Sequence, residues 1–484
     1  MTTTNFTHAL YRHARGKATL TLLSALLAGC TLLGPDYVKP EPKIPGQWSR
    51  STGSNNIEIS HQAQDLSTWW AQLDDPLLAE LISSALQSNL DLRAAQARLQ
   101  ESRARRNLAS GNRFPTLTGG LSGSRNRASG NTAQLFDAGF DASWEPDVFG
   151  GQRRALEGAN ADLEARQADL QATQVSLSAE LALNYIEVRN AQARLRIARD
   201  NLATQAETLQ ITDWRAQAGL ATVLDVDQAR TNLEQTRATI PNLETTLAQA
   251  EHRIAILLGE TPAALHDQLA TPVALPALPD QVATGIPADA LRQRPDVRAA
   301  ERRLAAETAR IGSAMADRYP SFNLTGSFGW KAATLGGLGG PGTVVSSLAA
   351  SMLGTLFDGG RLSSRIAVQN AVQKQALVAY EQSVLTALED VENALAAYKF
   401  QRERQQTLRT AAASSRSAAK LARQLYESGN ADFQKVLDAQ RSLLAIEDSL
   451  AASEAQGLSA LVQLYKAMGG GWQPLPESTE ESTS

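Results

Sequence analysis

Cysteine is almost absent from this chain of 484 residues, in which Cys30 has no second copy. A single cysteine cannot form an intramolecular disulfide, and the five histidines are scattered, so neither a disulfide scaffold nor a metal centre is expected. Gly-rich phosphate loops, nucleophile motifs and paired catalytic carboxylates are missing as well. The sequence therefore predicts neither an enzyme nor a cofactor.

An excess of positive charge and long apolar runs are also lacking. The formal net charge is −4, which gives no basic footprint for nucleic acid. Beyond residue 30 there is no apolar run of about eighteen residues, so no transmembrane helix is expected. Aromatic residues make up only 5% of the chain, whereas Ala, Gln, Leu, Arg and Glu dominate long stretches. That composition is typical of long helices and coiled coils.

The surroundings of the single cysteine indicate a lipid anchor. A positive region at 12–17 precedes an apolar run at 18–28, which is too short to span a bilayer and typical of a signal peptide. Small residues then precede Cys30, so that Leu-Ala-Gly-Cys at 27–30 resembles a bacterial lipobox. An inert buried thiol is the alternative for a lone cysteine. We predict a signal peptide at 1–29, acylation of Cys30 and, because Thr31 follows it, sorting to the outer membrane.

The chain repeats itself with a period of about 205–210 residues. Residues 92–115 and 297–320 are identical at ten of 24 positions without a gap. Further on, 218–230 lines up with 428–441, where Gly219 matches Gly429. Each half therefore has the order helix, alternating segment, long helix, Gly turn and helix.

Heptad spacing runs through two stretches of more than fifty residues, 152–212 and 362–426. In the first, leucine or valine recurs every seven residues, with one four-residue step between Leu177 and Leu181. Such an interrupted heptad pattern predicts a helix packed along its length as a coiled coil. An ordinary core stripe is the alternative, but globular helices usually run 8–20 residues. Four shorter helices are expected to stack end to end in pairs alongside the long ones: 76–112, 222–258, 288–317 and 432–467.

Two segments of about ten residues alternate as strands do. In 136–145 one face carries Phe140 and Trp144, and in 321–330 one face carries Phe322 and Phe328. The opposite faces are polar, and segments 114–124 and 346–357 alternate less cleanly. A half-buried sandwich strand is one interpretation, and a strand with lipid outside and water inside is the other. Four strands cannot close a barrel, so a membrane barrel would need several chains, and three would supply twelve strands.

Several motifs together resemble the outer membrane factors of tripartite efflux pumps, in the OprM-like or NodT lipoprotein branch of the TolC superfamily. They are the lipobox, GPDYVKP (34–40), the segment at 69–99 that begins WWAQL, SWEPDVFGGQRRA (143–155) and the two Gly-turn segments. The resemblance implies a mixed α and β fold, in which a homotrimer forms a shared twelve-stranded outer-membrane β-barrel. It also implies a coiled-coil α-barrel in the periplasm with an equatorial domain around it.

The same resemblance implies partners and a domain plan. The expected partners are a periplasmic adaptor protein that contacts the tips at Gly219 and Gly429, an inner-membrane pump of the RND type, and outer-membrane lipid. Phe140, Trp144, Phe322 and Phe328 would face that lipid. The expected domains are the signal peptide (1–29), an anchor and equatorial segment (30–74), the first repeat (75–259), an equatorial crossover (260–287), the second repeat (288–468) and a C-terminal tail (469–484).

A gate is expected at the periplasmic tip, because a duct open at rest would leak. By resemblance, the constriction lies at Gln434, Asp438 and Arg441. The last two are spaced i, i+3 and share a helix face, and Arg441 could pair with Asp438, Asp225 or Asp227. The family often has an apolar residue where Gln434 stands. An ordinary solvated helix pair is the alternative for these charges.

The sequence thus predicts the outer-membrane channel of a tripartite efflux system, which passes drugs, toxic compounds or metals outward. Two alternatives stay open at this point. One is a similar duct that serves type I protein secretion, and the other is a coiled-coil lipoprotein that does not span the membrane.

Overall fold

The computed structural model describes residues 32–49, 58–60, 66–128, 131–279, 281–283 and 287–472. Within these ranges the chain forms two compact units, each assembled from separate segments. Unit 1 comprises the described residues of Met1–Glu41, Arg98–Gln167 and Ala299–Glu381. Unit 2 comprises those of Pro42–Ala97, Ala168–Arg298 and Gln382–Ser484. Cys30 and the predicted signal peptide lie outside the described residues.

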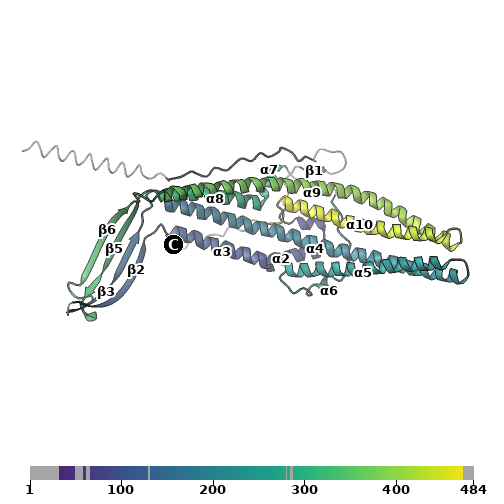
Figure 1. Ribbon diagram of the computed structural model, residues 1–484, viewed down its shortest axis with the longest axis horizontal. Coiled ribbons are helices and arrows are strands. Elements are labelled where there is room, and N and C mark those ends of the chain that lie inside the picture. The colour runs from purple at the N-terminus through teal and green to yellow at the C-terminus, as the bar shows by residue number, and fades with distance from the viewer. Residues whose placement is uncertain are drawn as a thin grey trace, which may run out of the picture. The chain divides into compact units, whose positions relative to one another are not determined.

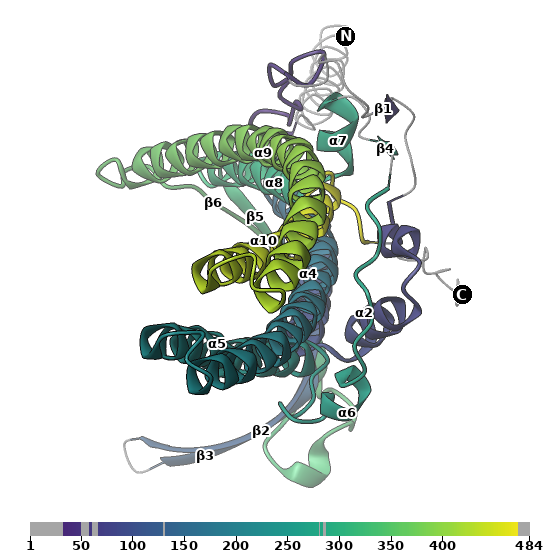
Figure 2. The same cartoon turned by 90° about the vertical axis from the view of Figure 1, so that its right-hand side faces the viewer.

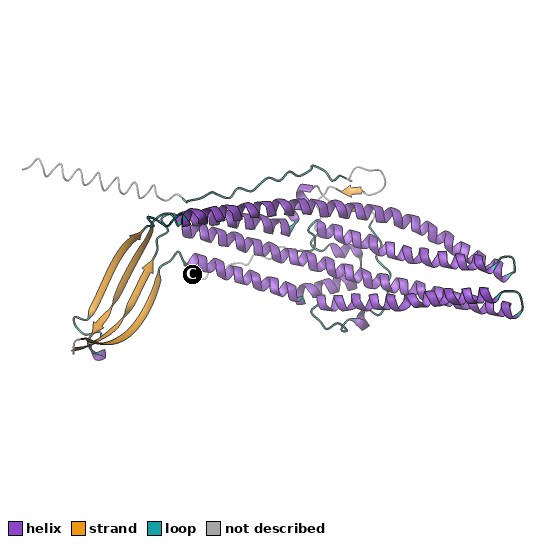
Figure 3. Ribbon diagram, viewed as in Figure 1, coloured by secondary structure: helices purple, strands orange, loops and turns teal. Residues whose placement is uncertain are grey.

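Two helical hairpins dominate the fold, one from each repeat (Figures 1 and 3). The first consists of α4 (Gly151–Gln217) and α5 (Val223–Leu257), and the second of α9 (Arg361–Glu427) and α10 (Phe433–Ala467). The long arms have 67 residues each and the short arms 35 each. The two long helices predicted from heptad spacing are therefore confirmed, and each exceeds its predicted range by a few residues.

Of the four shorter helices expected from the sequence, 222–258 and 432–467 are confirmed as α5 and α10, and the other two are each broken once. The expected helix 76–112 divides into α2 (Pro76–Ser88) and α3 (Leu90–Gly111), and 288–317 divides into α7 (Pro287–Gln293) and α8 (Pro295–Ala316). At the first break the side chain of Asn89 accepts a hydrogen bond from Leu92 N at 2.9 Å, as a helix cap does. At the second, Pro295 disfavours helical backbone for the residue before it. The predictions of unbroken helices were wrong for these reasons.

A four-stranded antiparallel sheet lies in unit 1, with the strand order β2-β3-β5-β6 (Figure 3). Its strands are β2 (Thr116–Ala128), β3 (Asn131–Trp144), β5 (Ser321–Ala332) and β6 (Val344–Leu353). In the described part of the chain, β2 and β6 each have one neighbour within this sheet. The sheet therefore has two open edges.

The strand register sorts side chains into an apolar and a polar face. Phe140 pairs with Phe328, and Phe328 with Ser346, while Leu117 pairs with Ala142. Because paired residues project to the same side of a sheet, most large apolar side chains of the four strands share one face, and Leu135, Val345 and Leu353 are exceptions on the other face. On the other face Lys331 Nζ lies 3.2 Å from Asp137 Oδ2. This segregation extends the alternation seen in two strands of the sequence to all four.

A row of glycines crosses the polar face. Gly139 pairs with Gly120 on one side and with Gly329 on the other. A Cβ on Gly139 would lie 2.8 Å from Phe328 O, and one on Gly329 would lie 2.5 Å from Ala138 O. The backbones of β3 and β5 approach too closely there for any side chain, so glycine is required at both positions.

Unit 2 contains small elements that the sequence did not indicate. A two-stranded parallel ladder pairs β1 (Glu58–Ser60) with β4 (Gln281–Ala283), and the other short elements are η1 (Trp69–Leu73) and α6 (His266–Leu269). A further 3-10 turn, η2 (Leu335–Gly337), belongs to unit 1. Trp69 is fully buried in unit 2 and stacks on Tyr465, with ring centroids 5.4 Å apart. Trp69, from the WW pair of the sequence, therefore packs against the C-terminal part of α10.

Candidate functional site

The two hairpin tips, both in unit 2, have the same backbone turn. Gly219 and Gly429 both have a φ of 78°, in the left-handed region that favours glycine. At the first tip Leu220 N donates to Arg215 O at 2.7 Å, and at the second Asn430 N donates to Leu425 O at 2.8 Å. This is the Schellman pattern, in which glycine ends one helix and lets the chain reverse. Figure 2 shows the two hairpins one above the other.

The returning helices α5 and α10 begin with side-chain caps. Thr222 and Asp225 form a capping box, in which each side chain accepts a hydrogen bond from the backbone N–H of the other residue. At the second tip, Asp432 Oδ1 accepts from Lys435 N at 3.2 Å. Asp225, one of the candidate gate residues, is therefore occupied in fixing the start of α5.

A buried aromatic cluster ties the second tip to the first hairpin. Tyr426 and Phe433 pack edge to face with ring centroids 5.8 Å apart, and both are buried. The guanidinium of Arg215 lies 4.5 Å from the centroid of the Tyr426 ring, and its Nη1 donates to Tyr426 O at 2.7 Å. The Tyr426 hydroxyl lies 3.4 Å from Thr212 Oγ1. The C-terminal ends of α4 and α9 are thereby held together.

The predicted gate residues form an exposed stripe on α10. Gln434 Nε2 donates to Asp438 Oδ1 at 2.9 Å, so these two side chains are brought together. Arg441 Nε instead donates to the buried Asn232 Oδ1 on α5 at 3.1 Å. Among the described contacts, Arg441 has no bond to Asp438, Asp225 or Asp227, and Asp227 lies 3.9 Å from Arg230. The stripe is therefore linked to the first hairpin through Asn232.

Sequence reasoning missed Arg215, Tyr426 and Asn232. Their contacts, from Arg215 to Tyr426 and from Arg441 to Asn232, join residues more than two hundred positions apart. No local spacing in the sequence reveals such contacts. A polar residue at an inward position of a heptad was the available signal. Asn232 is only 4% exposed, in a helix whose other buried positions are mostly apolar.

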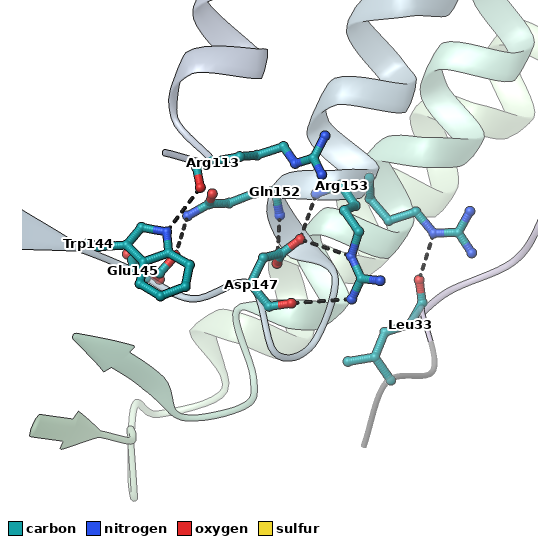
Figure 4. A network of polar contacts seen from close by, with 8 residues as sticks. Leu33, Arg113, Trp144, Glu145, Asp147, Gln152 and Arg153 are labelled. Atoms are coloured by element: carbon teal, nitrogen blue, oxygen red, sulfur yellow. Dashed lines mark hydrogen bonds and ion pairs between the residues drawn. The ribbon is translucent and has the colours of Figure 1, made fainter. Parts of the chain in front are cut away.

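The four residues expected to meet lipid lie on the apolar face of the sheet in unit 1. Phe140 and Phe328 are 52% and 50% exposed in the single chain, which leaves them available to an outside contact. Trp144 lies at the end of β3, where its Nε1 donates to Arg113 O at 3.0 Å (Figure 4). Phe322 lies 6.3 Å from the ring of Phe149. The two aromatics nearest the helices thus contact the loops that join sheet and helix.

The turn between the sheet and α4 is held by one carboxylate. Asp147 accepts hydrogen bonds from Gln152 N at 3.1 Å and from Arg153 N at 2.8 Å, as Figure 4 shows. Arg153 Nη2 returns a bond to Asp147 O at 3.2 Å. These bonds cap the first turn of α4 and fix where the helix leaves the sheet.

An extended segment, residues 32–41, follows the predicted anchor, and we refer to it as the N-terminal arm. The buried Arg154 of α4 donates to Leu33 O at 3.0 Å and to Asp36 Oδ1 at 2.7 Å. Its Nη1 bonds Glu157 at 2.8 Å. A Cβ on Gly312 of α8 would lie 2.5 Å from Leu33 O, so glycine makes room for the arm.

Glu301 of α8 holds the far end of the arm. Tyr37 Oη donates to Glu301 Oε1 at 3.0 Å, Lys39 Nζ lies 3.0 Å from Oε2, and Arg302 also bonds this carboxylate. Burial raises the pKa of Glu301, but these hydrogen bonds outweigh it and leave the pKa below its ordinary value. The arm is therefore docked by an ionised carboxylate and a buried arginine.

Neither a metal cluster nor a spanning helix is found among the described residues. No group of three or more His, Cys, Asp or Glu side chains there is arranged to hold an ion. No helix in the described ranges is long and apolar enough to cross a membrane.

Comparison with known proteins gives consistent matches along the chain. The family model described as outer membrane efflux protein matches residues 81–260 and 286–470. The outer membrane protein OprJ of Pseudomonas aeruginosa is 32% identical over 460 residues, which are 93% of this chain and 95% of OprJ. Nodulation protein T of Rhizobium leguminosarum bv. viciae is 32% identical over 453 residues, covering 93% and 92% of the two chains.

Solved channel structures share the fold. The outer-membrane channel OprN matches with a TM-score of 0.86 at 39% identity, covering 92% of this chain and 100% of that one. The open state of the Neisseria gonorrhoeae outer-membrane channel MtrE matches with a TM-score of 0.79 at 29% identity, covering 92% and 99%.

Proposed function

This chain belongs to the outer membrane efflux protein family, and from that premise we propose that three copies form one gated duct from the periplasm to the exterior. The sheet carries the proposal. Its strands have one apolar and one polar face, and its outer strands β2 and β6 have open edges. Since lipid tolerates no unpaired edge, sheets of neighbouring chains must pair there. Three four-stranded sheets give a barrel of twelve strands, within the range of known barrels.

Assembly and conduction test this duct together. Purified protein in detergent is expected to have the mass of a trimer and, in a planar bilayer, to give discrete conductance steps. A monomer with no conductance would exclude the duct and favour a lipoprotein that does not span the membrane.

Strand orientation follows from the two faces of the sheet. We place Phe140, Trp144, Phe322 and Phe328 against lipid and Asp141 toward water. A charge facing lipid near the midplane costs about 2–4 kcal/mol per chain, so Phe140→Arg is expected to prevent trimer assembly in the membrane. Asp141→Arg, one residue along and on the other face, is the matched control and is expected to assemble. The opposite outcome would invert the assignment of faces.

We assign the acyl anchor to Cys30. The docked N-terminal arm supports this, since Arg154 binds it at Leu33, three residues after the cysteine, and again at Asp36. Cys30→Ser is expected to abolish labelling by radioactive palmitate. Label incorporated into the variant would show that another residue is acylated.

The periplasmic gate is assigned to the stripe Gln434, Asp438 and Arg441 on α10. Three copies of Asp438 around a narrow axis would attract cations, and Arg441 links the stripe to α5 through Asn232. Asp438→Ala combined with Arg441→Ala is expected to raise conductance and vancomycin sensitivity, and to abolish block by a divalent cation added on the periplasmic side.

A matched control for the gate lies on α5. Glu234 and Arg237 form an exposed pair with the same i, i+3 spacing, 2.6 Å apart. Their double alanine variant is expected to leave conductance and block unchanged. If the α10 variant behaves like this control, the constriction lies elsewhere along the hairpins.

The tips at Gly219 and Gly429 are assigned to contact with a periplasmic adaptor protein, which connects the duct to an inner-membrane pump of the RND type. This assignment rests on the family and on the exposed apolar side chains of the first tip, Leu220, Val223 and Leu224.

A further inference from the structure

Two clefts lie on the helices of unit 1. The first, of about 400 Å³, is lined by α4 and α8 and contains Tyr37 of the N-terminal arm. The second, of about 540 Å³, is lined by α3, α4, α8 and α9 and contains no arm residue. On α8, Arg302 and Ala305 line the first cleft, whereas Arg303, Glu307 and Arg310 line the second. At 3.6 residues per turn the centres of these two sets lie about 135° apart around the helix, so the two clefts open on different faces of it.

The arm identifies which cleft faces the water-filled interior. It leads to Cys30, whose acyl chains, if the proposed anchor is correct, enter lipid outside the barrel. The arm and its cleft therefore lie on the outer face of the helices. The second cleft lies on the other face of the same helices, which in the proposed duct is the wall of the lumen.

The lining of this lumenal cleft has an excess of positive charge. Its arginines are matched between the two repeats, because Arg98 and Arg105 of α3 align with Arg303 and Arg310 of α8. Arg166 of α4 adds a fifth, against the three carboxylates of Glu101, Asp162 and Glu307. The excess is two charges per chain, and it is repeated in every chain of an assembly.

The carboxylates of the cleft are already engaged. Arg105 Nη2 lies 2.7 Å from Glu101 Oε1, and Arg310 forms ion pairs with both Asp162 and Glu307. No ion pair of the cleft joins Arg98 to a carboxylate. Burial is the main reason that the pKa of Asp162 lies above its ordinary value, and the nearby arginines Arg310, Arg166 and Arg303 act in the opposite direction.

We infer that this cleft is a binding site for anionic groups, carboxylates or phosphates, in transit through the duct. Arg98 and Arg303 supply planar donor forks that fit such groups better than ammonium groups do. Arg105 and Arg310 form a second tier seven residues along, about 10 Å further along the helices. A confined aqueous passage strengthens the potential of such tiers and concentrates anions there.

Binding of inorganic tripolyphosphate to the detergent-solubilised protein tests the site. Measured by isothermal titration calorimetry at low ionic strength, the wild type is expected to bind, and Arg98→Gln with Arg303→Gln to weaken binding at least about tenfold. Both arginines are exposed in the single chain, so the variant is expected to fold. Arg98→Lys with Arg303→Lys keeps the charge and is expected to fall between the two.

The matched control removes two arginines that do not line the cleft. Arg93 and Arg103 are exposed on other faces of α3, and Arg93→Gln with Arg103→Gln is expected to bind as the wild type does. Equal affinity of the wild type and the Arg98/Arg303 variant, or equal weakening in the control, would overturn the site.

Conductance separates failure of this inference from failure of the duct itself. A wild type that conducts but binds tripolyphosphate no better than the Arg98/Arg303 variant would refute the site and leave the duct intact. A wild type that binds through these arginines but never conducts would refute the duct and, with it, the transit role of the site.

Discussion

The two hairpin tips share one backbone and differ in almost every side chain that they expose. Both turn at a glycine with a φ of 78°, and both restart with a capped helix. The first tip, however, exposes Leu220 at 69% and Val223 at 74%. At the second tip the position equivalent to Val223 is Phe433, which is 4% exposed and packs on Tyr426.

This difference shows that turn geometry and surface chemistry are specified separately. Glycine and a cap are enough to reverse the helix, so the neighbouring side chains are free to diverge between repeats. The first tip has kept apolar groups on its surface, which suits contact with another protein. The second buries its aromatic side chains and carries on α10 the polar stripe that we propose as the gate. The two copies of the hairpin thus have the same turn but different surface chemistry at their tips.

The largest difference in stability between the two tips is expected when the equivalent residues Phe433 and Val223 are truncated. Phe433→Ala is expected to destabilise the second tip by about 3–5 kcal/mol, because it removes a buried ring. Val223→Ala is expected to change the stability of the first tip by less than about 0.5 kcal/mol, because its side chain is exposed. Amide hydrogen exchange in the first turns of α5 and α10 measures both, and similar losses at the two tips would contradict the comparison.

The link between the hairpins comes next. Arg215→Met keeps the length of the side chain but removes the hydrogen bond to Tyr426 O, at an expected cost of about 1.5–3 kcal/mol. The end of α9 should then exchange faster and the conductance of the duct should rise. Arg230→Met, an exposed arginine on α5, is the control and should do neither. Unchanged exchange in the Arg215 variant would mean that the aromatic cluster alone holds the tip.

The caps are where the two tips should behave alike. Thr222→Ala and Asp432→Ala each remove a side-chain acceptor from the first turn of a helix, at an expected cost of about 1 kcal/mol. Exchange of the amides of Asp225 and Lys435 reports each loss. A large effect at one tip and none at the other would show that the backbones are not equivalent after all.

The smallest effect on stability is expected at the apolar surface of the first tip. Leu220→Asp with Leu224→Asp should change stability by less than about 0.5 kcal/mol, yet abolish drug resistance in cells by preventing adaptor contact. Ser428→Asp with Asn430→Asp places the same charges on the second tip and should reduce resistance less. If both variants lose resistance equally, the proposed functional difference between the tips is contradicted.

The elements that could be predicted from the sequence are those specified by local spacing. Heptads gave the long helices, Gly219 and Gly429 gave the turns, and alternation gave two strands of the sheet, so the TolC-like fold and the family resemblance are confirmed. These signals extend over a few neighbouring residues and need no knowledge of distant ones.

The features that could not be predicted depend on distant parts of the chain. The three-residue strands β1 and β4 exist only because 58–60 and 281–283 meet, and neither has a pattern of its own. The bonds from Arg215 to Tyr426 and from Arg441 to Asn232 join separate hairpins. The break at Asn89 did leave a signal, since asparagine before a helical run is a common cap.

The glycine row on the polar face of the sheet bears on the bore of a closed barrel. In a barrel of three such sheets, Gly120, Gly139 and Gly329 of every chain would face the lumen, so nine of the twelve strands would each present bare backbone to the water at one position. Where the wall has no side chains, the lumen is wider by about one side-chain layer than it is beside that row. Bulky cargo would meet a local widening of the lumen there, and replacing Gly120, where a Cβ would have open space, by a larger residue would narrow it in triplicate.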